Sequence, residues 1–264
     1  MSRTYLFALL IIVCAGIFLR MYPMQIPLSH DEWYTFDVIN RDLTGMNIQM
    51  FDDVHVPLYF YIAKISTTFF GMSEISLRIL SLIFGIMGIL VFAYMTRQFL
   101  GERVSILATG FLSLSVFHVS YSQIARMYSL LFLLATLVLL FLFQIIFRQR
   151  KRTILGYVLI NLALLYTHIF GYFLFLFEIV SLWRYRKKFA DASKVLKANI
   201  IVFVFSIPVH VFVVIQIWRK IIGISYGNWM PETKLIDIYH AFAAISSNDL
   251  LIWPIVILFV YFVY

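Results

Sequence analysis

The chain has 264 residues, of which 62% are hydrophobic and only 13% are charged. A soluble domain averages about a quarter charged residues, so this composition excludes a soluble globular protein and indicates an integral membrane protein. The net charge of +8 comes from short basic clusters between apolar runs. That pattern is typical of cytoplasmic loops rather than of nucleic-acid binding, so no nucleic-acid partner is expected.

The apolar runs predict an all-α, polytopic transmembrane protein with about eight spans. The first run, residues 5–19, follows Arg3, which places the N-terminus inside. A cleavable signal peptide is the alternative, but no small-residue cleavage site follows the run. The other expected spans are residues 75–96, 104–120 and 127–147, two short crossings within 153–183 that fold back at 167–171, residues 198–218 with a kink at Pro208, and a last span from residue 250.

Residues 22–56 are predicted to form a long polar first loop with room for short helices, and residues 57–70 an apolar segment that follows it. About 20 residues are needed to cross a bilayer, so 57–70 is too short and is predicted to lie along the membrane surface. The basic clusters then all face the cytoplasm, as the positive-inside rule requires. The same topology brings the first loop, the polar patch 121–126 and the turn 167–171 to the non-cytoplasmic face.

The first loop carries Asp31 and Glu32, directly after the first span. Carboxylates beside a membrane cost free energy unless water or a substrate contacts them. Their presence here therefore indicates a functional site. An ordinary solvated loop is the alternative. Because adjacent residues point in different directions, one carboxylate is expected to do chemistry while the other structures the loop.

Asp52, Asp53 and His55 add a second group of carboxylates and imidazole. With His30 they resemble a set of metal ligands, since both residue types bind divalent ions. Their spacing matches no metal motif, which favours a water-facing acidic loop instead. If a divalent ion is bound, the candidate ligands are Asp53, His55 and His168.

Arg126 is a permanent cation at the membrane edge, and its planar guanidinium suits contact with a phosphate. An arginine that merely snorkels to the interface is the alternative, but that explains neither Gln123 nor Tyr128 beside it. For His168, at the outer fold-back, the alternative is a hydrogen-bonded structural histidine. His118 and His210 lie in apolar runs and are predicted to be structural, whereas Glu178 is the only charge in residues 153–183.

Several stretches, in chain order, resemble the motifs of the superfamily that contains the protein O-mannosyltransferases and the lipid A aminoarabinose transferases. Residues 30–34 resemble its Asp-Glu motif, and residues 55–59 its His-Pro-Pro-Leu-Tyr motif, with Val56 in place of a proline. Residues 71–78 resemble Gly-x-Ser-Glu-x-x-x-Arg. Residues 121–130 resemble Tyr-Ser-Gln-Glu-Ala-Arg-Met-Tyr-Ser-Leu with one replacement, and residues 166–168 resemble Tyr-Thr-His.

The resemblance implies a C-type glycosyltransferase fold and the transfer, with inversion, of a mannose-like sugar from a polyprenyl-phosphate donor. The acceptor would be a hydroxyl on a protein, lipid or glycan, at a site on the non-cytoplasmic face of the plasma membrane. Asp31 takes the family's catalytic position. Val54 stands where one branch has a metal-binding Glu, which argues against carrying that metal site over to this chain. A divalent ion is the only cofactor considered. The expected substrate-binding residues are Glu32, His55, Tyr121, Gln123, Arg126 and His168.

Two other classes of function stay open. A lipid-glycan transporter or flippase would need charged residues at midplane depth, for which Glu178 is nearly the only candidate. A non-catalytic membrane subunit would tolerate the loss of Asp31. The chain ends in an apolar run, residues 250–264, without a flanking charge. Residues 1–264 are therefore expected to form one transmembrane glycosyltransferase domain that is truncated at its C-terminus.

Overall fold

The computed structural model describes residues 1–21, 24, 26–52, 55–148, 153–188 and 192–222. These residues form α-helices and one 3-10 turn, with no strand among them, which confirms the prediction of an all-α protein. The helices are α1 (Arg3–Met21), α2 (His30–Asn40), α3 (Leu43–Asp52), α4 (Leu58–Phe70), α5 (Glu74–Leu100), α6 (Glu102–Leu114), α7 (Val116–Gln123), α8 (Tyr128–Arg148), α9 (Ile154–Leu165), α10 (Gly171–Tyr185), α11 (Ala192–Phe205) and α12 (Ile207–Ile221).

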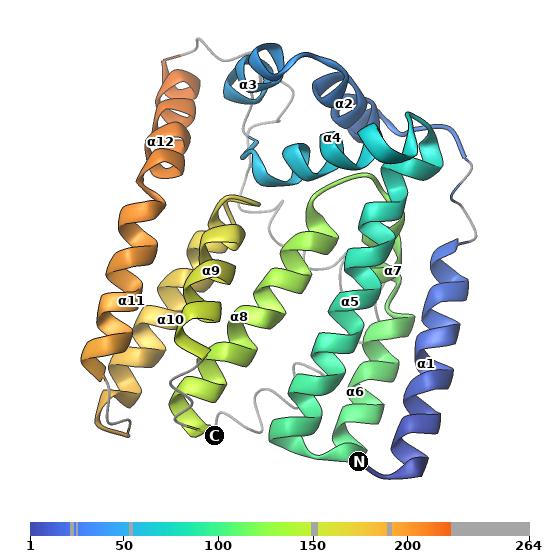
Figure 1. Ribbon diagram of the computed structural model, residues 1–264, viewed down its shortest axis with the longest axis vertical. Coiled ribbons are helices and arrows are strands. Elements are labelled where there is room, and N and C mark those ends of the chain that lie inside the picture. Colours follow the sequence, from blue (N-terminus) through green and yellow to red (C-terminus); the bar gives the residue numbers. More distant parts are fainter. Residues whose placement is uncertain (22–23, 25, 53–54, 149–152, 189–191, 223–264) are drawn as a thin grey trace, which may run out of the picture.

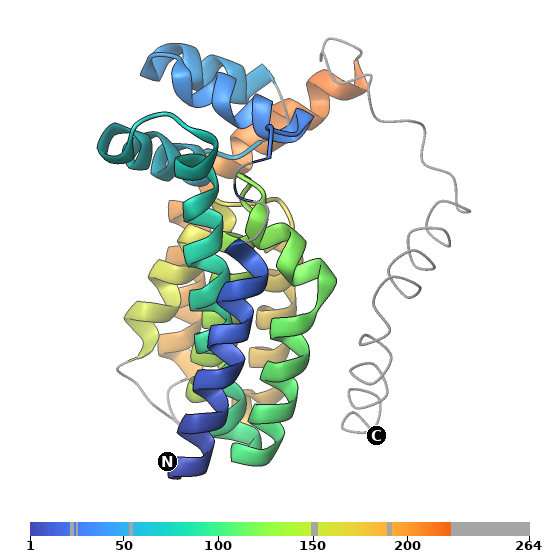
Figure 2. The same ribbon diagram turned by 90° about the vertical axis from the view of Figure 1, so that its right-hand side faces the viewer.

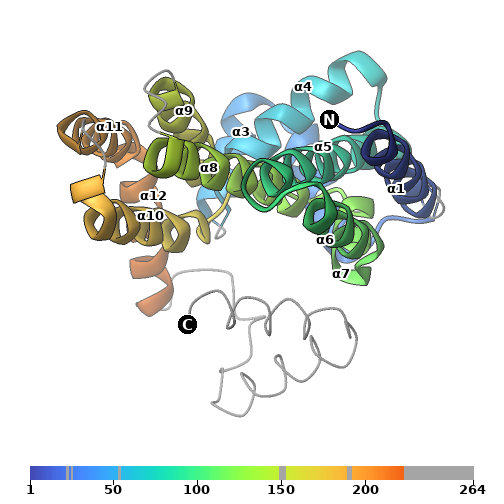
Figure 3. The same cartoon turned by 90° about the horizontal axis from the view of Figure 1, so that it is seen from below.

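The helices are arranged in two layers. Helices α1 and α5 to α11 stand side by side as an upright bundle, and α2, α3 and α4 cover one end of it (Figures 1 and 2). Seen end-on, the bundle is elongated, with α1 and α11 at its two extremes (Figure 3). We call the covered end the cap end. The opposite end, where α5 meets α6 and α10 approaches α11, is called the basic end because Arg97, Arg103 and Arg184 lie there.

Three of the described helices, α1, α5 and α8, are long and apolar enough to cross a membrane. The number rises to five if each bent pair, α6 with α7 and α11 with α12, is one span. Helices α9 and α10, of 12 and 15 residues, are shorter than the about 20 residues that a full crossing needs, and the predicted fold-back at 167–171 falls between them. The span expected from residue 250 lies outside the described residues.

The structure adds detail to three predicted elements. Residues 104–120, predicted as one straight span, are two helices that meet at an angle of 56°. The bend falls at Ser115, whose hydroxyl accepts from the backbone N–H of His118 and so caps α7. The predicted loop 22–56 in fact contains α2 and α3. The kink predicted at Pro208 is found nearby, where α11 and α12 meet at 52°.

Helix α4 holds the position predicted for a surface segment, because it lies across the cap end of the bundle (Figure 1). Its 13 residues reach about 20 Å, less than the hydrocarbon thickness of about 30 Å. One face, with Tyr59, Phe60 and Ala63, is buried. Gly71 ends the helix with φ of 74°, a left-handed conformation that glycine adopts without steric cost. Helix α5 can therefore turn directly down into the bundle.

Buried polar side chains link the bundle helices to one another. Arg20, at the end of α1, is fully buried and donates to the backbone oxygens of Gly16 and Ser113. Its Nη2 also lies 2.7 Å from Nδ1 of His118 on α7. In α10, Glu178 accepts from the amide of Asn161 on α9 at 2.9 Å. Such bonds substitute for the hydrophobic drive that is missing between helices in lipid.

Candidate active site

Glu32 is the centre of a polar cluster at the cap end. It lies in the first turn of α2 and is only 1% exposed. Arg78, from the second turn of α5, donates from Nε to Oε1 and from Nη2 to Oε2, both at 2.7 Å. Two parallel bonds between a guanidinium and a carboxylate form a charge-assisted pair of high geometric specificity.

Three further donors complete the surroundings of the Glu32 carboxylate. They are the backbone N–H and the hydroxyl of Ser29, at 2.9 and 3.0 Å, and the backbone N–H of Ala125 at 3.0 Å. Burial by itself raises the pKa of Glu32, but the hydrogen bonds from Arg78, Ser29 and Ala125 outweigh it and lower this pKa to about 2. The carboxylate therefore stays ionised, and all of these bonds come from the protein itself.

Arg78 extends the cluster to the segment that joins α1 to α2. Its Nη1 donates to the backbone oxygens of Met24 and Ile26, at 3.1 and 2.7 Å, and its Nη2 to that of Pro27 at 3.2 Å. One ion pair thus fixes the entry to α2, the start of α5 and the segment at Ala125 relative to one another. Asp31 and Arg126, the neighbours of Glu32 and Ala125 in sequence, are placed by the same contacts.

Arg126 forms the second part of the cluster and is only 6% exposed. Its Nη2 lies 2.6 Å from Nε2 of His55, and its guanidinium lies over the ring of Tyr34, 5.7 Å from the centroid. The rings of Tyr34 and His55 stack at 4.8 Å. Arginine only donates, so Nε2 of His55 accepts and the ring proton is assigned to Nδ1. Arg126 Nη1 also reaches the backbone oxygen of Asp31, at 3.4 Å.

His168 reaches the same cluster from the turn between α9 and α10. Its Nδ1 accepts from the backbone N–H of Phe170 at 3.1 Å, which assigns the ring proton to Nε2. Burial lowers the pKa of His168, and the charges of His55 and Arg126 lower it further, to about 4. His168 is therefore neutral at pH 7 and can donate a hydrogen bond from Nε2. Three motifs that are far apart in the sequence thus meet here, as predicted.

Asp31 differs from its neighbour Glu32 in its surroundings. Both lie in the first turn of α2, where the helix dipole favours a carboxylate. Glu32 points into the protein and is buried, whereas Asp31 is exposed. The backbone of the exposed residue Asp31 thus contacts the buried cation Arg126. This arrangement can hold an anion at the guanidinium while the carboxylate takes a proton from a second molecule.

Tyr121 and Gln123, both predicted to bind substrate, lie further from Arg126. The ring of Tyr121 packs on that of Tyr128 at 4.5 Å, and Tyr128 in turn lies 5.9 Å from the ring of His168. Gln123 donates from Nε2 to the backbone oxygen of Leu19 at 2.8 Å. Gln123 therefore ties the cap end of α1 to the end of α7, and Tyr121 supports the aromatic wall beside His168.

The metal candidates do not form a complete set of ligands in the described part of the chain. No group of three or more His, Cys, Asp and Glu side chains among those residues could hold a metal ion. His55 directs Nε2 at Arg126, and His168 directs Nδ1 at a backbone N–H. Asp53 lies outside the described residues. Asp52, from the same acidic group, pairs with Arg219 of α12 at 2.9 Å.

Sequence reasoning did not assign a site role to Arg78, Ser29 or Tyr34. A signal for Ser29 was present, because Ser-x-x-Glu is the pattern in which Glu accepts from the backbone N–H at the start of a helix, as Glu32 does here. Arg78 stands at the edge of an apolar span, where a charged residue always needs a partner. Its partner is 46 positions away in sequence, and no local pattern identifies it.

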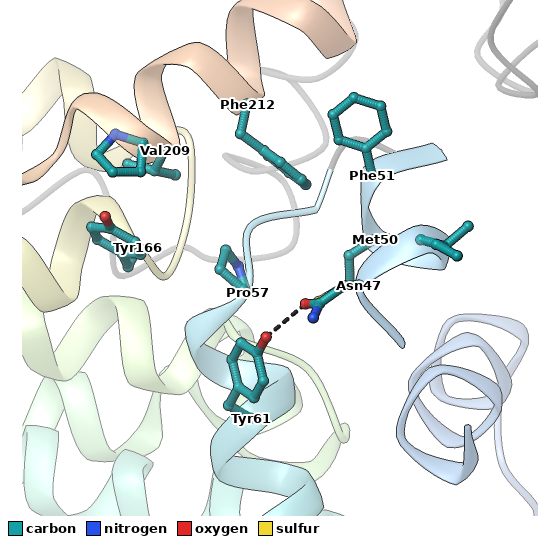
Figure 4. Close-up of a pocket in the computed structure, with 10 residues that line it drawn as sticks. Asn47, Met50, Phe51, Pro57, Tyr61, Tyr166, Val209 and Phe212 are labelled. Atoms are coloured by element: carbon teal, nitrogen blue, oxygen red, sulfur yellow. Dashed lines mark hydrogen bonds between the residues drawn. The ribbon is translucent and has the colours of Figure 1, made fainter. Parts of the chain in front are cut away.

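An apolar groove lies next to the cluster, between α3, the start of α4 and α12 (Figure 4). Its volume is about 480 Å³. Phe51 and Phe212 approach it from α3 and α12, and Tyr61 donates to the side-chain oxygen of Asn47 at 2.6 Å (Figure 4). Tyr166 lines the groove, two positions before His168. The groove and the polar cluster therefore adjoin each other through the turn after α9.

The fold and the site together define a polytopic, all-helical membrane protein with a polar cluster under surface helices at one end of its bundle. Residues 54–212 match the family model of the dolichyl-phosphate-mannose-protein mannosyltransferases. The match covers more than half of the chain, and the chain belongs to this family. It is accordingly a membrane glycosyltransferase of the mannosyltransferase type. Among curated proteins, none matches the chain in sequence.

Proposed function

We propose that the protein transfers a mannose-like sugar from a polyprenyl-phosphate donor to the hydroxyl of a protein, lipid or glycan acceptor. The observation that carries the proposal is the contact between the buried guanidinium of Arg126 and the backbone oxygen of Asp31, at 3.4 Å, which brings the exposed residue Asp31 next to the cation. A lipid-linked donor is met at the membrane surface, so its phosphate needs a cation at that depth. The acceptor hydroxyl needs a base as it attacks.

In the proposed reaction, the acceptor oxygen forms a bond to the anomeric carbon while the bond from that carbon to the phosphate oxygen breaks. Asp31 takes the hydroxyl proton. The polyprenyl phosphate leaves as a stable anion beside Arg126, so no second carboxylic acid is required, unlike the pair of a glycosidase. One direct displacement inverts the anomeric carbon. Glu32 and Arg78 act as positioning residues, because their contacts are with the protein.

Two features support Arg126 as the phosphate ligand. Its Nε has no hydrogen-bond partner among the described residues although it is buried, so a donor remains for an arriving oxygen. His168 offers a second neutral donor from Nε2 nearby. The groove of Figure 4 supports the lipid part of the proposal, since an apolar channel beside the cluster suits a prenyl chain.

The direct test is transfer by membranes that contain the protein. Radiolabelled polyprenyl-phosphate mannose is added, and the label is followed into protein, lipid and glycan fractions. We expect incorporation that depends on the protein and on Asp31. Label that crosses the bilayer while it stays on its carrier would indicate a flippase instead. Membranes with the Asp31→Asn variant that still support transfer by a partner enzyme would indicate a non-catalytic subunit.

Arg126→Lys keeps the charge but loses the planar fork. A hydrogen bond to a charged group contributes about 1.5–3 kcal/mol, so the KM for the donor should rise roughly 10- to 150-fold. The matched control is Arg41→Lys, at an exposed arginine of the same end that forms an ion pair with Asp37. An unchanged donor KM in Arg126→Lys would support an arginine that only snorkels to the interface.

Ile48→Trp should narrow the groove of Figure 4, because Ile48 lines it and is exposed. If the prenyl chain lies there, a donor with a long chain should show a KM raised about tenfold, which corresponds to the loss of about two buried methylene groups. A donor with a ten-carbon chain should be affected much less. Leu43→Trp, on the same helix but outside the groove, is the control. An equal increase in KM for both donors would show that the prenyl chain does not lie in this groove.

The site is proposed to face away from the cytoplasm, since the opposite end of the bundle is basic. The test uses a Cys14→Ser background with one new cysteine. Thr44→Cys, exposed in α3, should react with an impermeant maleimide in intact cells. Ser193→Cys, at the basic end, should react only after permeabilisation. The reverse pattern would contradict the proposed orientation.

A further inference from the structure

A second cavity lies between α10 and α11, towards the basic end of the bundle and away from the candidate active site. Its volume is about 520 Å³. Its polar lining includes Trp183, Arg186 and Ser193 near the ends of the two helices, with Asn199 further along α11. The rest of the lining is apolar and comes from both helices, chiefly Phe175, Ile179 and Leu182 of α10 and Leu196, Ile200 and Phe203 of α11.

Arg186 places a cation at the mouth of this cavity. Its guanidinium lies over the ring of Trp183, 4.5 Å from the centroid, and its Nη1 donates to the backbone oxygen of Trp183 at 2.7 Å. Arg186 is exposed, and within the described ranges no carboxylate pairs with it. These contacts hold the guanidinium beside the Trp183 ring at the edge of the cavity. Neither contact is with a negatively charged group.

The sequence around the mouth is strongly basic. Residues 184–197 contain six Lys and Arg residues and one acid, Asp191. Arg184 and Lys187 are exposed there. Ile179, Leu196 and Ile200 on the flanks of the cavity are also exposed, between 42% and 62%, as lipid-facing side chains are. An apolar slot that ends in a basic rim, with Arg184, Arg186 and Lys187 exposed, is complementary to an amphiphile with a negative head.

We infer that the groove between α10 and α11 binds an anionic phospholipid of the adjoining leaflet. One acyl chain would lie along the apolar walls, and the headgroup phosphate would meet Arg186 beside Trp183. Basic pockets between membrane helices bind anionic headgroups in this way, and a basic residue near such a surface contributes about 1 kcal/mol. The site is separate from the proposed donor groove, which lies at the cap end. It therefore does not depend on the proposed function.

The test uses Trp183 as the reporter. In the full chain, Trp33, Trp218, Trp229 and Trp253 are replaced by Phe, and the protein is placed in phosphatidylcholine nanodiscs. Increasing fractions of brominated phosphatidylglycerol or brominated phosphatidylcholine are then added, and quenching of Trp183 fluorescence is measured. We expect brominated phosphatidylglycerol to reach half-maximal quenching at a roughly five-fold lower mole fraction, which is about 1 kcal/mol converted to a ratio of binding constants. Equal quenching by the two lipids would overturn the inference.

Two variants separate a defined site from general attraction to a basic surface. Arg186→Gln should abolish the preference for phosphatidylglycerol, whereas Arg186→Lys should keep most of it. Arg184→Gln removes an equally exposed charge that does not line the cavity, so it should leave the preference nearly unchanged. If Arg184→Gln and Arg186→Gln reduce the preference equally, no specific site exists. Inorganic phosphate at millimolar concentration should not compete, and competition would show an ion site rather than a lipid site.

Discussion

Asp31→Asn is expected to lower kcat by roughly 10²–10⁴ at saturating donor, which is the usual contribution of a general base. An acceptor hydroxyl has a pKa far above neutral, so it needs a proton acceptor within hydrogen-bond reach as it attacks. Asparagine has nearly the same shape but cannot take the proton. Folding and the KM for the donor should change little, because Asp31 is exposed and the hydrogen bond from Arg126 goes to its backbone oxygen.

The control for this prediction is Asp37→Asn, which removes an exposed carboxylate from the same helix. Asp37 forms an exposed ion pair with Arg41, at 2.9 Å, and its loss should leave kcat within about twofold, since an exposed pair contributes little. The variants Asp52→Asn and Asp53→Asn test the other acidic group of the loop. If Asp31→Asn keeps a near-normal kcat while either of these two variants loses activity, Asp31 is not the catalytic base.

The spans of the bundle were predictable because their signal is strong and local. Long apolar runs bounded by basic residues predicted α1, α5 and α8 within a few residues. Short length and charge parity together predicted that residues 57–70 lie on the surface. The first loop was predicted to have room for short helices, but α2 and α3 could not be located within it because they are short, with only part of one face buried. Their stability comes from packing against α4 and α12, which no local pattern reveals.

The structure brings several of the predicted site residues together, whereas their roles in binding and catalysis stay predictions. The motifs around Asp31, His55, Arg126 and His168 do converge, with Arg126 2.6 Å from His55. Glu32 and Gln123 were expected to touch substrate, yet both form hydrogen bonds to protein groups, Glu32 with Arg78 and Gln123 with the backbone of Leu19. Adjacent carboxylates look alike in a sequence. Only the fold shows that one is buried in an ion pair while the other is exposed.

Arg78→Met is expected to destabilise the protein by about 3–5 kcal/mol, because it leaves Glu32 as a buried charge without its cation. The pair is almost completely buried, with side-chain exposures of 2% and 1%. Ser29 and Ala125 still donate to the carboxylate, but two charge-assisted bonds and the contacts to the segment before α2 are lost. The measurement is unfolding of the purified protein in detergent, followed by circular dichroism, with donor binding recorded in parallel.

The pH dependence of the same variant gives an independent check. The pKa of Glu32 falls from 4.5 to about 2 on folding, so its contribution to stability is complete above pH 4.5 and is lost as the pH falls towards 2. Without Arg78 the pKa of Glu32 in the folded state rises. Lowering the pH should therefore reduce the free energy of unfolding of the variant by less than it reduces that of the native protein. An equal loss for both proteins between pH 6 and pH 3 would contradict the assigned pair.

The double variant Arg78→Met with Glu32→Gln separates the ion pair from simple packing. It leaves no uncompensated buried charge, so it should be more stable than Arg78→Met alone, with a coupling between the two sites of about 0.5–3 kcal/mol. Strictly additive losses would mean that each side chain acts through other neighbours. If the pair positions Asp31 and Arg126, as their adjacency to Glu32 and Ala125 in the chain implies, the stable double variant should still show a raised donor KM. A merely structural pair would restore the KM together with stability.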